Sequence, residues 1–422
     1  MFTKIKKGYN EYPNAFKVLT LATFIDMLGT FLLFPFFSRY IINHFGVGMI
    51  EVGYLFSIFA VGNIFGSTIG GALADKYGRR RMILIGLIVS GISSILMGLV
   101  NDLNVFYLLA GFLGLIGNFG GPARQAMVAD LLPQEKQAEG FGILRVSFNL
   151  SAVIGPILGG FLASQSYMFL FIMDAVSSII TAIIVYSVIP ETKPQVLKDK
   201  PEESVMKTMI GYKEVLKDWK FMLFLAVSAI TVLVYMQMNS TLSVFLWKVY
   251  MFPDASFGLL LSMNAIIVVI FQFWITRKVS KYAPMKIMAF GTIFLMIGFS
   301  MYGFISEPYL FFVAMAIITI GEMIVYPTGQ SAAATFAPGD KRGRYMAVLG
   351  FQWAIPNLFG ALGAGLIMRY IGPNWVWYIA GILSLSAIIG YWLLHGITKE
   401  LFSKEKEQIK EPLIEYTVSS IE

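Results

Sequence analysis

Residues 71 to 81 read Gly-Ala-Leu-Ala-Asp-Lys-Tyr-Gly-Arg-Arg-Arg, a short charged turn between two long apolar runs. The runs on either side, 50–74 and 82–101, each hold about the 20 apolar residues that a helix needs to cross roughly 30 Å of hydrocarbon. Gly78 permits a tight turn, and Gly71 permits a close approach between helices. The stretch therefore predicts two membrane-spanning helices joined by a charged connection.

The same alternation of apolar runs and charged connections continues along all 422 residues. A composition of 57% hydrophobic and 14% charged residues is too apolar for a protein that faces water, because such proteins are about one quarter charged. The expected spans are 16–42, 50–74, 82–101, 104–131, 139–163, 167–189, 218–248, 256–277, 284–305, 308–335, 342–369 and 374–396. We therefore predict an all-α integral membrane protein with twelve transmembrane helices, six in each half.

The positions of Lys and Arg predict the orientation of the chain. All but five of the 32 lie in connections that fall on one side of the membrane; the exceptions are Arg39, Lys248 and Arg369 near the other side and Arg124 and Arg145 within spans. Cytoplasmic connections retain positive charge. Both termini are therefore expected in the cytoplasm, with the chain in the cell membrane.

The longest and most charged connection separates the two groups of six spans. We predict an N-terminal six-helix bundle at 1–189, a cytoplasmic linker at 190–217, a C-terminal six-helix bundle at 218–398 and a cytoplasmic tail at 399–422. Within the linker, a helical spacing of apolar residues leaves open an amphipathic surface helix or a solvated linker. The residues of this pattern are Val205, Met209, Tyr212 and Leu216.

A shift of 205 positions superposes one half of the sequence on the other. It places Lys76-Tyr77 on Lys281-Tyr282, and it places Pro122 and Gln125 on Pro327 and Gln330. A constant offset over about 80 residues indicates a duplication rather than shared apolar composition. Two similar bundles around a shared site are typical of transporters in which one half rocks against the other.

The sequence lacks the residues and motifs that several classes of chemistry require. There is no Cys, and the two His are His44 and His395, so a thiolate site or a His-rich metal site is not expected. Nucleotide-binding and hydrolase motifs are also absent from the sequence. We expect no enzymatic activity, no cofactor, no metal and no nucleic acid as a partner. The expected partners are a small-molecule substrate, protons and the lipid bilayer, and the expected state is a monomer.

The stretch 71–81 resembles the signature GxLaDxxGRKR of the major facilitator superfamily, matching every specified position except that Arg80 stands in place of the lysine. The resemblance implies the fold of that superfamily, with two pseudo-symmetric six-helix bundles. A network of charges in this loop can hold two helices in one conformation and release them in another. An ordinary capped loop with anchoring arginines would explain the arginines but not the full spacing. The candidate switch residues are Gly71, Asp75, Gly78, Arg79 and Arg80.

Residues 151–160 resemble a second motif, gxxxGPxxGG, of the superfamily's proton antiporters, with Ser151 in place of the first glycine. The resemblance implies export. Small residues also favour ordinary contacts between helices in lipid, which is the alternative explanation. The matching residues are Gly155, Pro156, Gly159 and Gly160. The arginine that such antiporters carry on their fourth span falls at Gly111 here, and Arg124 and Arg145 are the candidate substitutes.

Ionisable side chains inside a membrane are candidates for functional sites because each costs roughly 3 kcal/mol or more to insert. Asp26 lies about 15 Å into the first span and Glu322 about 21 Å into the tenth. We expect both to alternate between holding a proton and facing a cationic substrate, or else to be permanently neutral structural groups. Arg124 and Arg145 share a depth, so either can pair with Asp26, or both together can bind an anionic group.

Other polar side chains within spans are less informative. Pairing with Lys136 is the simpler explanation for Asp130, and Asp174 is as well explained by a structural role. Uncharged or aromatic candidates for a cavity lining are Asn118, Asn149, Gln237, Tyr326 and Gln330.

Taken together, these features resemble most the drug:proton antiporter (multidrug efflux) branch of the superfamily. The resemblance implies a secondary active transporter that exports lipophilic small molecules in exchange for protons, by alternating access, with organic cations as candidate cargo. A transporter of the same fold for a specific metabolite, sugar or anionic lipid-type substrate is the first alternative. A non-transporting membrane scaffold is the second.

Overall fold

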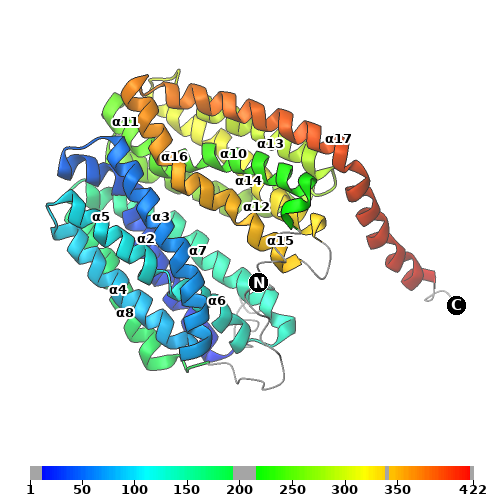
Figure 1. Ribbon diagram of the computed structural model, residues 1–422, viewed down its shortest axis with the longest axis horizontal. Helices are drawn as coiled ribbons and strands as arrows, with labels where there is room; N and C mark the ends of the chain where they lie inside the picture. The colour runs from blue at the N-terminus through cyan, green and yellow to red at the C-terminus, as the bar shows by residue number, and fades with distance from the viewer. Residues whose placement is uncertain (1–11, 193–214, 338–341, 419–422) are drawn as a thin grey trace. The chain divides into compact units, whose positions relative to one another are not determined.

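The computed structural model describes residues 12–192, 215–337 and 342–418 (Figure 1). The helices are α2 (Asn14–Phe45), α3 (Met49–Tyr77), α4 (Arg79–Leu99), α5 (Leu103–Phe112), η1 (Leu113–Gly117), α6 (Gly120–Leu131), α7 (Gln134–Ala163), α8 (Tyr167–Val188), α10 (Trp219–Ser240), α11 (Leu242–Tyr250), α12 (Asp254–Val279), α13 (Pro284–Met301), α14 (Pro308–Phe336), α15 (Arg342–Leu349), α16 (Phe351–Tyr370) and α17 (Trp375–Val418). Most of the predicted linker, including Val205, Met209 and Tyr212, lies outside the described residues.

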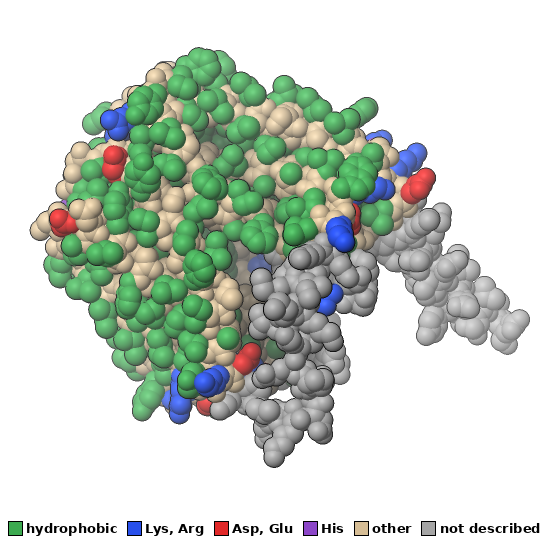
Figure 2. Space-filling view, viewed as in Figure 1, with side chains coloured by type: hydrophobic (Ala, Val, Ile, Leu, Met, Phe, Trp, Pro, Cys, Tyr) green, Lys and Arg blue, Asp and Glu red, His purple; other side chains and the backbone are tan. Residues whose placement is uncertain are grey.

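Among the described residues, twelve helices or runs of helix are long and apolar enough to cross a membrane, as the sequence predicts. Large apolar side chains point outward from them; Phe273 on α12 is 78% exposed and Leu108 on α5 is 74% exposed. Figure 2 shows such side chains over much of the visible face, with most charged side chains toward its margins. A surface of this kind suits lipid rather than water. The chain is therefore a multi-pass membrane protein.

Three predicted spans contain interruptions that hydropathy alone did not predict. The fourth passes from α5 through the π-helix η1 into α6. The seventh divides at Thr241, between α10 and α11, and the eleventh divides at Gly350, between α15 and α16. Because π-helical turns inside longer helices often occur at functional sites, the break in the fourth span marks a place to look for one.

Contacts between Cα atoms divide the chain into two compact units. Of the described residues, unit 1 contains 12–192, 237–266 and 357–373, and unit 2 contains 215–236, 267–356 and 374–418. In unit 1, α2 packs along α7 and α8; in unit 2, α13 packs along α14 and α17 (Figure 1). Because α10, α12 and α16 each contribute to both units, the units do not follow the two halves of the sequence. The bundles at 1–189 and 218–398 remain a prediction.

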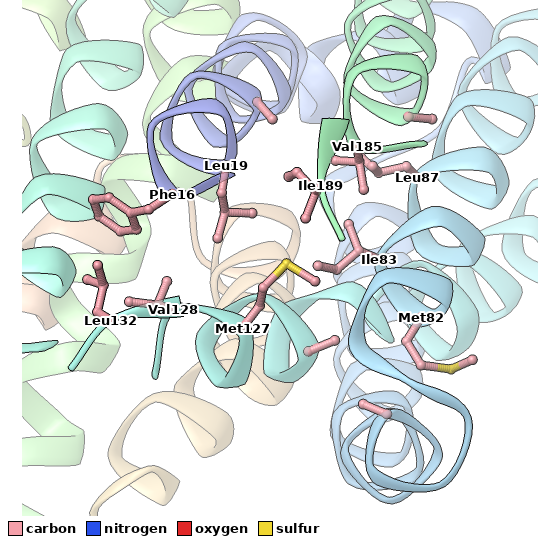
Figure 3. Close-up of a cluster of buried hydrophobic side chains, with 14 of the residues drawn as sticks. Phe16, Leu19, Met82, Ile83, Leu87, Met127, Val128, Leu132, Val185 and Ile189 are labelled. Atoms are coloured by element: carbon pink, nitrogen blue, oxygen red, sulfur yellow. The ribbon is translucent and has the colours of Figure 1, made fainter. Parts of the chain in front are cut away.

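Two clusters of buried apolar side chains hold unit 1 together. In the first, Phe16 and Leu19 of α2 meet Ile83 of α4, Met127 of α6 and Val185 of α8 (Figure 3). The second is aromatic, with Tyr40, Phe106 and Phe171 at its centre. Lipid is as apolar as these side chains, so close packing rather than exclusion of water favours these contacts. The two clusters fix the helices that surround the polar groups of unit 1.

The last helix is longer than the sequence predicts. The expected span ends at 396 and the expected tail begins at 399, yet α17 continues without a break to Val418. The Lys, Glu and Gln residues that are frequent in this region of the sequence are good helix formers. The described part of the tail is therefore helical rather than irregular.

Candidate functional site

A cavity of about 270 Å³ lies within unit 1, among α2, α3, α4, α6 and α8. Its walls are mostly apolar, with Phe34, Phe37 and Phe59 among them. Polar groups project into it at a few points, namely Asp26, Asn63, Ser94, Asn118, Arg124 and Asp174. An apolar space with a few well-placed polar groups is the usual form of a small-molecule site.

Asp26 and Arg124 form an ion pair in the wall of this cavity. The Nη2 atom of Arg124 lies 2.7 Å from Oδ2 of Asp26, and both side chains are largely buried, at 15% and 12% exposure. The structure thus selects Arg124 over Arg145 as the partner of Asp26, because Arg145 is exposed on α7. A charge-assisted hydrogen bond of this kind stabilises the ionised carboxylate as long as the pair is closed.

The π-helix η1 brings Asn118 to the same cavity. The side-chain amide of Asn118 donates to Oδ1 of Asn63 on α3 at 2.8 Å and to the backbone carbonyl oxygen of the same residue at 3.2 Å. Close packing on α3 explains the glycines before Asn118, since a Cβ at Gly114 would lie 2.5 Å from the carbonyl oxygen of Phe59. Gly111, where the resemblance places an arginine, also faces α3, because a Cβ there would lie 3.2 Å from the side chain of Ile58. The arginine of the fourth span that lines the cavity is Arg124.

Glu322 lies in unit 2 among aromatic side chains. Tyr235 makes a side-chain hydrogen bond to Glu322, and Tyr326 lies close enough to interact with it electrostatically. The rings of Tyr235 and Tyr326 are 4.9 Å apart, and Tyr326 and Trp353 are 5.3 Å apart. A small cavity of about 20 Å³ adjoins this group and is lined by Tyr326, Gln330, Gln352, Trp353 and Tyr391, among others. Glu322 therefore stands beside a group of aromatic rings, whose faces attract cations.

The charged loop of residues 71–81 forms the network that its sequence suggests. Arg79 is buried, and its Nη2 atom lies 3.0 Å from Oδ1 of Asp75. Its Nε atom lies 3.1 Å from Oδ2 of Asp130 on α6. Asp130 thus has a partner that the sequence did not suggest, while Lys136, its expected partner, lies over the ring of Tyr12. The network joins the end of α3, the start of α4 and α6.

Of the two glycines singled out in this stretch, Gly78 meets the expectation and Gly71 does not. Gly78 has φ of 108°, a conformation that favours glycine, as predicted. A Cβ at Gly71, however, would make only an ordinary contact with Pro122 at 3.8 Å. The close approach falls one residue earlier, at Gly70, where a Cβ would lie 2.7 Å from Cα of Phe119.

The sequence did not reveal the partner of the α4 terminus. The carboxylate of Glu191 accepts hydrogen bonds from the backbone N–H groups of Arg80 and Arg81, at 3.1 and 3.3 Å. It therefore satisfies free donors at the positive end of the helix. The side chain of Arg80 donates to the carbonyl oxygen of Tyr186 and lies over the Tyr186 ring. Both contacts attach the loop to the end of α8.

The second motif brings α7 close to two other helices of unit 1. A Cβ at Gly155 would lie 2.6 Å from Cβ of Phe31 on α2, and one at Gly160 would lie 2.6 Å from the carbonyl oxygen of Asp254. Gly159 likewise faces Leu32 and Phe36 of α2. Pro156 lies inside the continuous helix α7. These contacts are those of small residues that let helix backbones approach closely.

A cluster around Arg39 was missed at the level of sequence, where this residue was only a charge near a span end. Arg39 is 1% exposed and pairs with Asp254 at 2.5 Å. It also donates to the carbonyl oxygens of Ser243 at 2.9 Å and Phe252 at 3.0 Å. Tyr167 donates to the second oxygen of Asp254 at 3.2 Å. The cluster joins α2, α8, α11 and α12 within unit 1.

The remaining residues predicted from the sequence, Gln237 and Asn149, are not among those that line the 270 Å³ cavity. Gln237 is buried and donates to the carbonyl oxygen of Gly360 at 3.3 Å, so it joins α10 to α16. Asn149 is half-buried on α7. Of the two predicted coupling acids, Asp26 belongs to unit 1 and Glu322 to unit 2. Across the described ranges, no group of three or more His, Cys, Asp or Glu is placed to hold a metal ion.

A lipid-embedded helical chain whose spans enclose a cavity with buried charges has the form of a membrane transporter. The model of the Major Facilitator Superfamily matches residues 19–356 and 239–420. The chain therefore belongs to the major facilitator superfamily, and its family and fold are those of transporters.

The chain is similar to several relatives over nearly its whole length. It is 25% identical to a Na(+), Li(+), K(+)/H(+) antiporter of Planococcus maritimus, over 91% of this chain and 97% of the relative. It is 24% identical to multidrug resistance protein 1 of Bacillus subtilis, over 86% of this chain and 92% of the relative. The solved structure of the nucleoside transporter NupG matches with a TM-score of 0.78 at 13% identity, covering 90% of this chain and 100% of that one. This structural likeness shows the fold.

Proposed function

We propose that this chain exports lipophilic small molecules, with organic cations as its principal cargo, in exchange for protons. The observation that carries the proposal is the ion pair of Asp26 and Arg124 in the wall of the 270 Å³ cavity. Protonation of Asp26 removes the charge that holds Arg124, so a proton entering this site opens the pair. Relatives that are named multidrug resistance proteins support the export of varied organic compounds.

Glu322 has the second role in this proposal, as the group that meets a cationic cargo. The carboxylate supplies the opposite charge, and the faces of Tyr326 and Trp353 supply cation–π attraction. The same carboxylate can be neutralised by a proton once the cargo has left. Competition between a proton and a cation for one carboxylate is a direct way to couple the two movements.

The proposed orientation places both termini in the cytoplasm of a cell whose membrane potential draws protons inward. Each proton then contributes about 2.3 kcal/mol per 100 mV to the export of cargo. The network of Asp75, Arg79 and Asp130 is the proposed latch on the cytoplasmic side. The proposed transporting unit is a single chain.

The experiment uses inverted membrane vesicles that contain the full-length protein and a fluorescent pH indicator. Adding a lipophilic cation such as ethidium to energised vesicles is expected to release protons, and Glu322→Gln is expected to abolish this response. Glu139→Gln on α7 is the matched control, because Glu139 is exposed. An unchanged response of Glu322→Gln would remove Glu322 from the mechanism. Absence of proton release with wild-type protein across cationic and neutral cargo would overturn the proposal.

Inorganic cations are a second candidate cargo, favoured by the similarity to the Na(+), Li(+), K(+)/H(+) antiporter of Planococcus maritimus. The same vesicles distinguish the two candidates when Na⁺, Li⁺ or K⁺ is added in place of ethidium. Proton release by these ions alone would assign the chain to inorganic cation exchange.

An anionic cargo is less well supported by the arrangement of the arginines. Two arginines that read an anion must both face it, whereas Arg124 is engaged by Asp26 and Arg145 is exposed on α7. Replacing both arginines by Gln tests this alternative, since a selective loss of anionic cargo would support it.

A further inference from the structure

Asp174, on α8, is a second carboxyl group in the cavity that contains Asp26 and Arg124. It is only 8% exposed. Ser94 of α4 donates a hydrogen bond to its Oδ2 atom at 2.8 Å. Its Oδ1 atom lies against α2 at Gly29, where a Cβ would stand 3.0 Å from it. The absence of a side chain at Gly29, one turn of α2 from Asp26, leaves room for the Ser177 hydroxyl group, which a Cβ would meet first, and for this carboxyl group.

The charges around this cavity do not balance if both acids are ionised. The charged residues that line it are Asp26, Arg124 and Asp174. Arg124 is engaged by Asp26, and the bond that the structure gives the Asp174 carboxyl group comes from a neutral hydroxyl group. Neighbouring α4 faces it with Ser94, and Arg145 of α7 is exposed. Two carboxylates and one guanidinium would leave a net charge of −1 inside the membrane.

An ionised carboxylate without a cationic partner is costly in this environment. The neutral acid avoids that cost and keeps the hydrogen bond from Ser94, which its carbonyl oxygen can accept. Its own O–H is then free to face the cavity or the α2 side. The arrangement thus suits a carboxyl group that holds a proton while the ion pair beside it is closed.

We propose that Asp174 is a second proton-binding site of this transporter, distinct from the ion pair of Asp26 and Arg124. When its O–H bond breaks, the electron pair stays on the carboxylate and the proton passes to water in the cavity. The cavity charge then falls from zero to −1, because Arg124 is then the one arginine against two carboxylates among the residues that line the cavity. A cationic cargo can supply the missing positive charge. This inference rests on the proposed proton coupling and adds to it a residue for which the sequence favoured a structural role.

The test measures protonation directly on the purified full-length protein. Infrared difference spectra between acidic and alkaline buffer report the C=O stretching band of any carboxylic acid that loses its proton. Wild-type protein is expected to show a band that Asp174→Asn lacks and that Glu139→Gln retains. Asn keeps the volume of Asp and can still accept the hydrogen bond from Ser94, so its effect on folding is small. A band that is unchanged in Asp174→Asn would overturn the proposal.

Proton release in the vesicle assay gives the second readout. Asp174→Asn is expected to lose proton release while still binding ethidium, and Asp174→Glu is expected to restore part of it, which a purely structural role would not explain. If Asp174→Asn releases protons as wild type does, the inference fails and the proposed function stands. If wild-type protein releases none, the proposed function fails, and the infrared band alone decides whether Asp174 binds an exchangeable proton.

Discussion

Helix α2 carries two buried ion pairs that differ in their surroundings. Arg39 is enclosed by Asp254 and two backbone carbonyl oxygens, and Tyr167 satisfies the other oxygen of Asp254. Asp26 instead meets Arg124 in the wall of a cavity of about 270 Å³. The first pair has its hydrogen bonds completed by neighbouring helices, whereas the second has open space beside it.

This difference suggests a structural role for the Arg39–Asp254 pair and a role in proton exchange for the Asp26–Arg124 pair. Breaking a pair whose arginine is fully enclosed and bonded only to protein atoms leaves a charge with little access to water. A pair beside a polar cavity can be replaced by hydrogen bonds to water or to a ligand. We therefore expect the Arg39 pair to contribute to stability and the Asp26 pair to transport, although both lie on one helix.

The largest expected effect is that of Arg39→Gln. It leaves the largely buried Asp254 without its counter-charge and removes a guanidinium that also bonds two backbone carbonyl groups, so the free energy of unfolding is expected to fall by about 3–5 kcal/mol. Thermal and chemical unfolding of the purified protein in detergent measure this. Arg369→Gln is the matched control, because Arg369 is exposed at the end of α16 and its loss is expected to cost about 0.5 kcal/mol or less. If Arg39→Gln lowers the free energy of unfolding no more than the control does, the Arg39–Asp254 pair has no stabilising role.

A smaller loss of stability is expected when an added methyl group pushes α7 away from Asp254. A Cβ at Gly160 would meet backbone atoms of Asp254 and Ala255, so Gly160→Ala is expected to destabilise by about 1–3 kcal/mol. Gly142→Ala on the same helix has open space around it and is expected to be neutral or to stabilise by up to about 1 kcal/mol. Unfolding of the two variants side by side gives the comparison. Equal free energies of unfolding for the two variants would show that α7 can shift away from Asp254 without losing stability.

The smallest effect on stability is expected at the cavity. Asp26→Asn is expected to lower the free energy of unfolding by about 1–2 kcal/mol, less than Arg39→Gln, because water in the cavity can solvate Arg124. The same variant is expected to lose proton-coupled transport. If Asp26→Asn is as destabilising as Arg39→Gln and transport survives in the folded fraction, the distinction between the two pairs does not hold.

Pairing between charged residues was only partly predictable. The sequence placed Asp26 within reach of two arginines at the same depth, but depth does not specify which face of a helix a side chain occupies. The structure turns Arg124 toward Asp26 and leaves Arg145 at the surface. Arg39 and Asp254 are 215 positions apart, so no local spacing could relate them.

The local irregularities of the helices could not be predicted from the sequence, for a related reason. Hydropathy predicts a span from its average polarity, and a π-helical turn such as η1 does not change that average. The glycines of this segment, Gly111, Gly114 and Gly117, were visible, but their use in packing on neighbouring helices depends on partners from α3 and α4. The same limit applied to Gly71, whose predicted close approach falls at Gly70.

The sequence by itself determined the twelve spans, the transporter family and the residues that carry charge into the membrane. The spans and the charges follow from composition, since about 20 apolar residues suffice to cross a bilayer and each charge within a span stands out against them. The family follows from the resemblance of residues 71–81 to the superfamily signature. Only the tertiary structure decided which charges meet, which glycines permit contact and that Asp174 shares a cavity with Asp26. Those outcomes depend on how helices rotate and pack against one another, and packing brings together residues that no spacing along the chain relates.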